Sequence, residues 1–193
     1  MKDTIRTEIT KAIGIFNAIH ADDVLLDKVA GFAQTIVDAL NAGNKVLIAG
    51  NGGSAADAQH IAGEFVSRFN YDRPGLPAFA LTTDTSVMTA IGNDYGYEKL
   101  FSRQVQAVGR KGDVFWGIST SGKSPNVLAA MQEARRNGLY VAGFTGASGN
   151  AMAELADVCI EVPSRETPKI QEGHILLGHI VCALVESSIF PRA

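Results

Sequence analysis

The chain has 193 residues, of which 46% are apolar, and its 17 Lys and Arg against 20 Asp and Glu give a formal net charge of −3 at pH 7. This composition excludes an intrinsically disordered chain, and the near-neutral balance gives no general attraction to nucleic acid or to a membrane surface. Two cysteines, Cys159 and Cys182, cannot form a disulfide framework, and the residues after Met1 lack a signal-peptide pattern. We therefore expect a cytoplasmic protein with one domain over 1–193.

The first forty residues predict two helices, because apolar residues recur at helical spacing over 5–16 and again over 29–40. Gly43 stands where a glycine would end the second helix. These helices form an N-terminal segment, 1–42, ahead of the repeating part of the chain.

From residue 45 the pattern repeats as a short apolar run, a turn of small residues and a helical stretch. The apolar runs are 45–49, 78–81, 114–118, 140–144 and 158–162, and the turns after the first four are 50–54, 82–85, 119–124 and 145–149. This alternation predicts a five-stranded parallel sheet in a three-layer αβα sandwich. The turns then lie at the carboxyl edge of the sheet, where such sheets bind ligands.

Two further segments complete the pattern. Residues 70–77, with two prolines, predict a connecting loop, and a last helix is expected from about 170 to 189. The apolar stretch 175–189 in that helix is interrupted by polar residues and is too short for a membrane span.

Four hydroxyls stand together in the run Ser119-Thr120-Ser121-Gly122-Lys123-Ser124, and Pro125 follows at a favoured first helical position. Hydroxyls, backbone N–H groups and a helix N-terminus can hold a phosphate without a large positive charge. One hydroxyl would cap the helix, and four are more than capping needs. The turn therefore favours a phosphate site.

The same turn matches the nucleoside-triphosphate loop G-x-x-x-x-G-K-[ST] over residues 117–124. Against a nucleotide kinase or ATPase, the motif lies past the middle of the chain and is followed at once by Pro125. No apolar strand ends in an Asp suited to anchor Mg²⁺. The kinase is the weaker alternative.

Adjacent glycines follow the first expected strand in the turn Asn51-Gly52-Gly53-Ser54. Such glycines let a ligand approach the backbone closely, and they equally suit a tight strand-to-helix turn. Asn93 and Asp94 also have two interpretations, because they can end a helix or bind a sugar hydroxyl.

His60 and Glu64 are four residues apart on the next expected helix, so their side chains share one face. The pair can hold Zn²⁺ or form an ordinary surface ion pair. Gln171 and His179 on the last helix are separated by about 12 Å of rise and reach one ion only when extended. A buried neutral histidine is the alternative for His179, and the adjacent Gly178 leaves room for a ligand or another backbone.

In order and spacing, these segments resemble the sedoheptulose 7-phosphate isomerase (phosphoheptose isomerase) family of the sugar-isomerase (SIS) domain superfamily. The resemblance covers nearly the whole chain and rests on 51–60 with Glu64, 93–96, 119–124 and 169–174 with His179. It implies an aldose–ketose isomerase that converts D-sedoheptulose 7-phosphate to D-glycero-D-manno-heptose 7-phosphate through an enediol, for lipopolysaccharide or capsule synthesis. It also implies a homotetramer with active sites at subunit interfaces, in whose packing the segment 1–42 takes part.

The resemblance further implies roles for single residues. Glu64 and His179 would be the acid–base pair, with Glu64 favoured as the first base. One Zn²⁺ per subunit would be held by His60, Glu64, Gln171 and His179. The substrate would lie against Asn51, Gly52, Gly53, Ser54, Glu64, Asn93, Asp94, Ser119, Thr120, Ser121, Ser124 and Gln171.

The same superfamily contains a non-enzymatic tetramer that binds the replication initiator DnaA. In that relative the positions of Glu64 and His179 have lost their acid–base residues, whereas this chain keeps all four expected ligand positions. The sequence therefore favours the enzyme over the scaffold.

Overall fold

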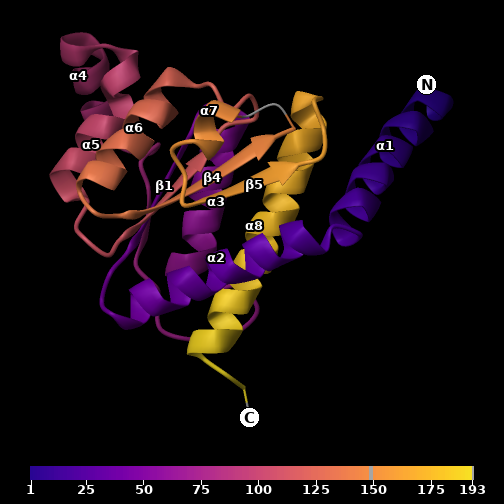
Figure 1. Cartoon of the computed structure of the whole chain (residues 1–193), viewed down its shortest axis with the longest axis horizontal. Coiled ribbons are helices and arrows are strands. Elements are labelled where there is room, and N and C mark those ends of the chain that lie inside the picture. The colour runs from indigo at the N-terminus through magenta and orange to yellow at the C-terminus, as the bar shows by residue number, and fades with distance from the viewer. Residues whose placement is uncertain (148–149, 193) are drawn as a thin grey trace.

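The computed structural model describes residues 1–147 and 150–192, so the last two residues of the expected turn 145–149 lie outside the described part of the chain. Figure 1 shows a central sheet between two layers of helices, with the N-terminal helix standing away from them. In chain order the elements are α1 (Lys2–His20), α2 (Asp23–Asn41), β1 (Val46–Gly50), α3 (Gly53–Val66), β2 (Ala78–Ala80), α4 (Thr85–Tyr95), the 3-10 helix η1 (Tyr97–Lys99), α5 (Leu100–Val108), β3 (Val114–Ile118), α6 (Pro125–Arg136), β4 (Tyr140–Gly146), α7 (Asn150–Ala153), β5 (Val158–Val162) and α8 (Thr167–Ile189).

The five strands form one parallel sheet in the order β2-β1-β3-β4-β5, which confirms the predicted αβα sandwich. β4 is two residues longer than its apolar run because Thr145 and Gly146 still pair with β5. α8 begins at Thr167, earlier than the apolar periodicity indicated, because Pro168 is well tolerated in a first helical turn.

The strand side chains alternate between two hydrophobic cores. On one face, α2, α3 and α8 cover residues such as Trp116, whose ring lies 4.8 Å from that of Phe32 and 4.6 Å from that of Phe144. On the other face, α5 and α6 cover residues such as Leu47 and Phe115. The inner strands β1 and β3 are thus buried on both sides, as is typical of a parallel sheet, whereas the edge strand β2 leaves Phe79 52% exposed.

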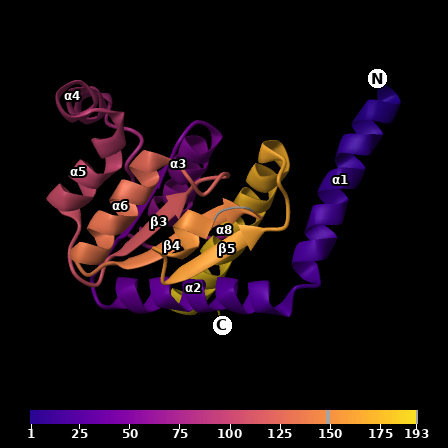
Figure 2. The same cartoon turned by 45° about the horizontal axis from the view of Figure 1, so that its top comes forward.

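The N-terminal segment divides into a packed and a protruding helix. α2 lies along the sandwich and buries Val29, Phe32 and Ile36, and Gly43 after it has the positive φ of +81° expected of a helix-ending glycine. α1 extends away from the body in both views (Figures 1 and 2), with large apolar side chains exposed along it.

Among the described residues, α8 is the one helix long and apolar enough to cross a membrane by length and composition. It lies in the core-side layer against α2 and α3, with residues such as Leu177, Val181 and Val185 buried. Its apolar character is accounted for by this packing.

The order of the strands creates a switch point between β1 and β3. From β1 the chain crosses to β2 on one side, and from β3 it crosses to β4 on the other, so the turns after β1 and β3 diverge from adjacent strand ends. In open parallel sheets, ligands bind in the crevice at such a point. Both turns singled out in the sequence lie there.

Candidate active site

The turns after β1 and β3 are joined by two amide side chains. Asn51 and Asn126 donate to each other's carbonyl oxygens, both over 2.9 Å, and the hydroxyl of Tyr97 donates to Asn51 Oδ1 over 3.0 Å. Asn126 is buried and also accepts from the N–H of Val127. This pair fixes the distance between the glycine turn and the serine turn.

The serine turn keeps its hydroxyls close together. Ser119 Oγ lies 2.9 Å from Ser124 Oγ and 3.5 Å from Ser121 Oγ, and Gly122 supports the turn with a φ of +64°. Within the described residues Ser124 is the N-cap of α6 but makes no side-chain cap hydrogen bond, and Pro125 occupies the first turn. These hydroxyls are therefore not engaged in capping and remain near the positive end of a 12-residue helix.

Three ionisable side chains meet between α3 and α8. His60 Nε2 lies 2.8 Å from His179 Nε2 and 3.2 Å from Glu64 Oε1, and one ligand atom from each of the three residues falls within 4.8 Å of the others. The Glu64 side chain is 23% exposed and that of His60 49% exposed, so the cluster is open to solvent on one side. Three lone-pair donors converging on one point fit a metal ion of the zinc type.

Gln171, the fourth expected ligand, lies two turns before His179 on α8. Its amide packs on Gly53, where a Cβ would overlap the Gln171 nitrogen, so a larger residue at 53 would displace the Gln171 side chain. Gly178 shows the same principle: a Cβ there would lie 3.0 Å from Ile61 Cδ1 of α3. The room beside His179 is thus filled by a side chain of α3, which brings the two helices together.

Ser54 is the least accessible of the expected substrate residues. It is 3% exposed in the first turn of α3, and its N–H donates to the carbonyl of Asn51 over 3.0 Å. In this structure Ser54 supports the turn. Gly52, with a φ of +57°, leaves its N-cap position without a side chain.

Asn93 and Asp94 lie exposed on the last turn of α4, where Asn93 donates to the Asp94 carboxylate over 2.8 Å. They do not end the helix, which continues to Tyr95 and stops at Gly96 with a φ of +83°. Tyr97 then reaches Asn51, so this segment adjoins the glycine turn. Within the described residues, no contact joins Asn93 or Asp94 to the histidine cluster.

The alternative role considered for His179, a buried and uncharged histidine, is filled by His174. His174 is 1% exposed and donates from Nε2 to the carbonyl of Thr145 over 3.1 Å. Burial lowers the pKa of His174 to about 4, so it is uncharged at neutral pH. His179 is only half-buried, and Phe69 packs on its ring at a centroid distance of 5.6 Å.

Sequence reasoning missed three residues of this site: Asn126, Tyr97 and Phe69. Asn126 follows Pro125 in the first turn of a helix, where an amide is commonplace. The signal available in the sequence was an amide directly after a helix-starting proline, at the end of the serine turn. Tyr97 and Phe69 carry no such signal, because their partners lie 46 and 110 positions away in the sequence.

Comparison with known proteins places this architecture in a class. A sequence model of the SIS domain family matches residues 11–146. The fold and the site thus define a SIS-domain protein.

Individual relatives narrow the class. The chain is 65% identical over 188 residues to a phosphoheptose isomerase of Burkholderia pseudomallei, covering 97% of this chain and 95% of the relative. It is 60% identical over 190 residues to that of Aneurinibacillus thermoaerophilus, covering 98% and 96%. The solved structure of the Neisseria gonorrhoeae phosphoheptose isomerase superposes with a TM-score of 0.90 at 41% identity, covering 96% and 98%. The chain belongs to the phosphoheptose isomerase family and is an isomerase.

Proposed function

We propose that the chain interconverts D-sedoheptulose 7-phosphate and D-glycero-D-manno-heptose 7-phosphate through an enediol, at the site built by the turns after β1 and β3 and by α3 and α8. The observation that carries the proposal is the convergence of His60, Glu64 and His179 within 4.8 Å. High identity to phosphoheptose isomerases over nearly the full chain supports the substrate. The same identity favours the enzyme over a DnaA-binding scaffold and over a nucleotide kinase.

The phosphate of the substrate is proposed to lie on the serine turn. Its ligands would be the hydroxyls of Ser119, Thr120, Ser121 and Ser124. Their clustering near a helix N-terminus supports this role, since a phosphate accepts such hydrogen bonds. Binding this remote group orients the small reacting end of the sugar.

The sugar is proposed to lie between the serine turn and the α3–α8 cluster. It would contact Asn51, Gly52, Gly53, Ser54, Glu64, Asn93, Asp94 and Gln171. Asn51 and Gln171 are already held by neighbours, Asn51 by Asn126 and Gln171 against Gly53. Preset side chains of this kind lose little freedom when substrate binds.

Glu64 and His179 are proposed to move the proton between C1 and C2. Isomerisation needs a base near the carbon and an acid near the carbonyl oxygen, and a carboxylate and an imidazole can exchange these roles near neutral pH. We assign the first abstraction to Glu64, whose half-open position beside His60 leaves its carboxylate accessible.

One Zn²⁺ per subunit is proposed at the same cluster. His60, Glu64, Gln171 and His179 would hold it. The close approach of the ligand atoms of His60, Glu64 and His179 supports ligation by nitrogen and oxygen. When bound, zinc would supply a Lewis acid that polarises the substrate carbonyl. The two imidazoles must then present unprotonated nitrogens, which sets the protonation state of the cluster.

A homotetramer with active sites at subunit interfaces is also proposed, with the whole chain as one SIS domain and the segment 1–42 packing between subunits. The exposed apolar row Ile5, Ile9 and Ile13 on α1, each more than half exposed, supports this. A contiguous exposed apolar stripe of this length commonly marks a contact surface. Sedimentation velocity measures the assembly directly, and a monomer would contradict it.

The product is proposed to enter heptose synthesis for lipopolysaccharide or capsule, in the cytoplasm. This rests on the family and on the charge and composition of the chain. It adds nothing to the chemistry of the site.

The function is tested with Glu64→Gln, which removes the basic carboxylate while keeping its shape. Isomerisation of sedoheptulose 7-phosphate should fall by a factor of about 1,000 or more, because no other carboxylate of the cluster replaces it. Glu133→Gln is the matched control, since Glu133 is also a helical carboxylate, 18% exposed and paired with a basic residue three positions on. Near-normal turnover by Glu64→Gln would contradict the catalytic assignment, and an inactive wild-type chain that binds DnaA would favour the scaffold.

A further inference from the structure

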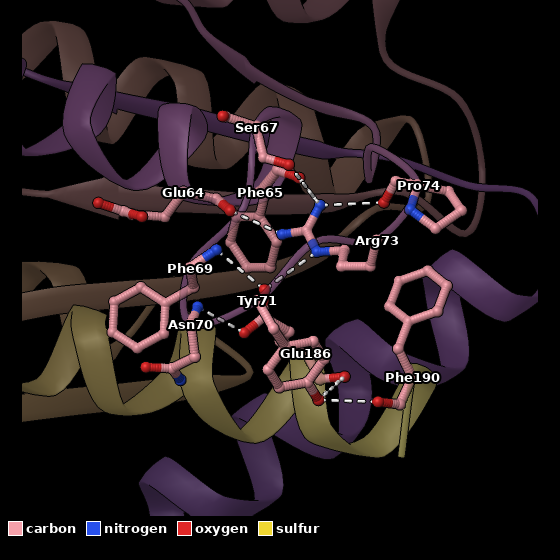
Figure 3. Close-up of polar contacts among 10 residues, drawn as sticks. All are labelled: Glu64, Phe65, Ser67, Phe69, Asn70, Tyr71, Arg73, Pro74, Glu186 and Phe190. Atoms are coloured by element: carbon pink, nitrogen blue, oxygen red, sulfur yellow. Dashed lines mark hydrogen bonds and ion pairs between the residues drawn. The ribbon is translucent and has the colours of Figure 1, made fainter. Parts of the chain in front are cut away.

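We infer that Arg73 and Glu186 are positioning residues, a buried ion pair that holds Glu64 and His179 in the geometry needed for proton transfer. The inference rests on the proposed roles of Glu64 and His179. Neither Arg73 nor Glu186 belongs to the motifs that carry the family resemblance, and Figure 3 shows how they lie.

Arg73 closes the end of the helix that carries Glu64. Its NH2 group donates to the carbonyl of Glu64 over 2.7 Å, and its NH1 group donates to the carbonyls of Phe65 and Ser67 over 2.6 and 3.1 Å. The carbonyls of Glu64 and Phe65 belong to the last turn of α3 and Ser67 is its C-cap, so no further helical N–H is available to these groups. A guanidinium here satisfies several acceptors at once and complements the helix dipole.

Glu186 holds the segment that follows α3. Its carboxylate accepts from the N–H of Phe69 over 2.9 Å, from the N–H of Asn70 over 2.7 Å and from Arg73 Nε over 3.1 Å. The side chains of Arg73 and Glu186 are 3% and 1% exposed. Burial opposes the charge, but the two N–H donors and the guanidinium keep the pKa of Glu186 below its usual value.

Glu186 connects the pair to His179 through Phe69. Glu186 lies seven residues after His179 on α8, which places both on one face, about 10 Å apart along the axis. The backbone that Glu186 holds carries Phe69, whose ring packs on the imidazole of His179 at a tilt of 34°. One ion pair therefore contacts the backbone of Glu64 and the backbone that carries Phe69 (Figure 3). Through the Phe69 ring it is connected to the imidazole of His179.

Stability alone does not explain this arrangement. Buried ion pairs are often no more stabilising than apolar side chains of similar volume, because removing two charges from water is costly. This pair instead fixes orientation, because a planar guanidinium and a carboxylate form hydrogen bonds in only a few relative geometries. Two helices that contribute one reacting group each are thereby locked in register.

The chain offers a matched control. Asp113, at the opposite edge of the sheet, is a carboxylate 1% exposed that accepts from the N–H groups of Lys45 and Arg110 and from Lys45 Nζ. Asp113 therefore makes three contacts of the same two kinds as Glu186: two with backbone amides and one with a side-chain cation. Asp113→Asn should lower Tm about as much as Glu186→Gln and leave turnover unchanged.

The experiment compares Arg73→Lys, Glu186→Gln and Asp113→Asn at a temperature where circular dichroism shows each folded. We expect Arg73→Lys and Glu186→Gln to lower kcat for sedoheptulose 7-phosphate by about 10- to 100-fold, with KM little changed and the pH profile of kcat shifted. The double variant Arg73→Met/Glu186→Leu should recover Tm without recovering kcat. If both single variants keep kcat within twofold, or if Asp113→Asn loses as much, the inference is wrong.

Two further variants make the result independent of folding and of the assigned site. Phe69→Leu keeps the backbone bonds to Glu186 and removes the ring contact to His179. If the ion-pair variants do not fold, a reduced kcat with a shifted pH profile in Phe69→Leu supports the inference, and unchanged values overturn it. If Glu64→Gln retains turnover, the proposed site itself is at fault; if Glu64→Gln is inactive while Arg73→Lys is normal, only the positioning role fails.

Discussion

The two edges of the sheet use polar side chains in opposite ways. At the amino edge, Asp113 accepts from the N–H groups of Lys45 and Arg110, and Asp157 accepts from the N–H of Val141 near the start of β4. Each carboxylate also contacts a basic side chain. At the carboxyl edge and the adjoining α3–α8 cluster, serine hydroxyls contact serine hydroxyls and His60 contacts His179. The carboxylates at the amino edge have fixed backbone partners, whereas these groups mainly contact one another.

This difference separates polar side chains that stabilise the fold from polar side chains that are available to a ligand. A carboxylate held by two backbone amides has little capacity left for a ligand, and its partners cannot move without local unfolding. Two hydroxyls or two imidazoles in contact can each turn to a phosphate or a cation at small cost. Substitutions at the two edges should therefore change different quantities, activity at one and stability at the other.

The largest effect after loss of Glu64 should come from the metal ligands. His60→Ala, or removal of metal by a chelator, should lower turnover by about 100-fold or more, because one ligand of the cluster and its Lewis acid are lost. Elemental analysis should find about one zinc per wild-type chain and less in His60→Ala.

His20→Ala is the matched control, since His20 is an exposed histidine at the end of α1, outside the cluster. It should keep both zinc and activity. A metal-free wild-type enzyme with full turnover would remove the metal from the proposal and leave acid–base catalysis.

A smaller effect is expected at the serine turn. Ser121→Ala/Ser124→Ala should raise KM for the sugar phosphate and the inhibition constant for inorganic phosphate by about 10- to 100-fold, because two hydrogen bonds to a charged group are lost. Ser102→Ala on α5, which removes a hydroxyl bonded to the carbonyl of Lys99, is the control. Unchanged phosphate inhibition would place the anion elsewhere.

The sequence predicts those features of the molecule that depend on local contacts, and it does not predict those that depend on contacts between distant residues. The sandwich was predictable because strand runs and small-residue turns are local patterns, and the i, i+4 spacing of His60 and Glu64 is local as well. The convergence of His179 on them was available only through family resemblance, since it requires α8 to pack on α3 across 119 positions.

The supporting contacts were not predictable from local patterns. Asn51 and Asn126 are 75 positions apart, and Arg73 and Glu186 are 113 apart. Residues 70–77 were correctly expected to form a loop, but nothing in two prolines indicates that Arg73 turns inward to end α3. Such pairs depend on tertiary distances, which no periodicity encodes.

The smallest predicted effect lies at His174, beneath the carboxyl edge, and it changes stability rather than turnover. Burial lowers the pKa of His174 to about 4, against about 6.5 in the unfolded chain, so between these values the unfolded state binds more protons. Stability is then complete above pH 6.5 and falls as the pH drops toward 4, by about 2 kcal/mol between pH 7.5 and pH 5. His174→Gln, which keeps a donor for the Thr145 carbonyl and cannot titrate, should reduce this slope in urea unfolding measured at both pH values. An equal slope in wild type and variant would assign the acid sensitivity to other groups and leave His174 a purely apolar-core residue with one hydrogen bond.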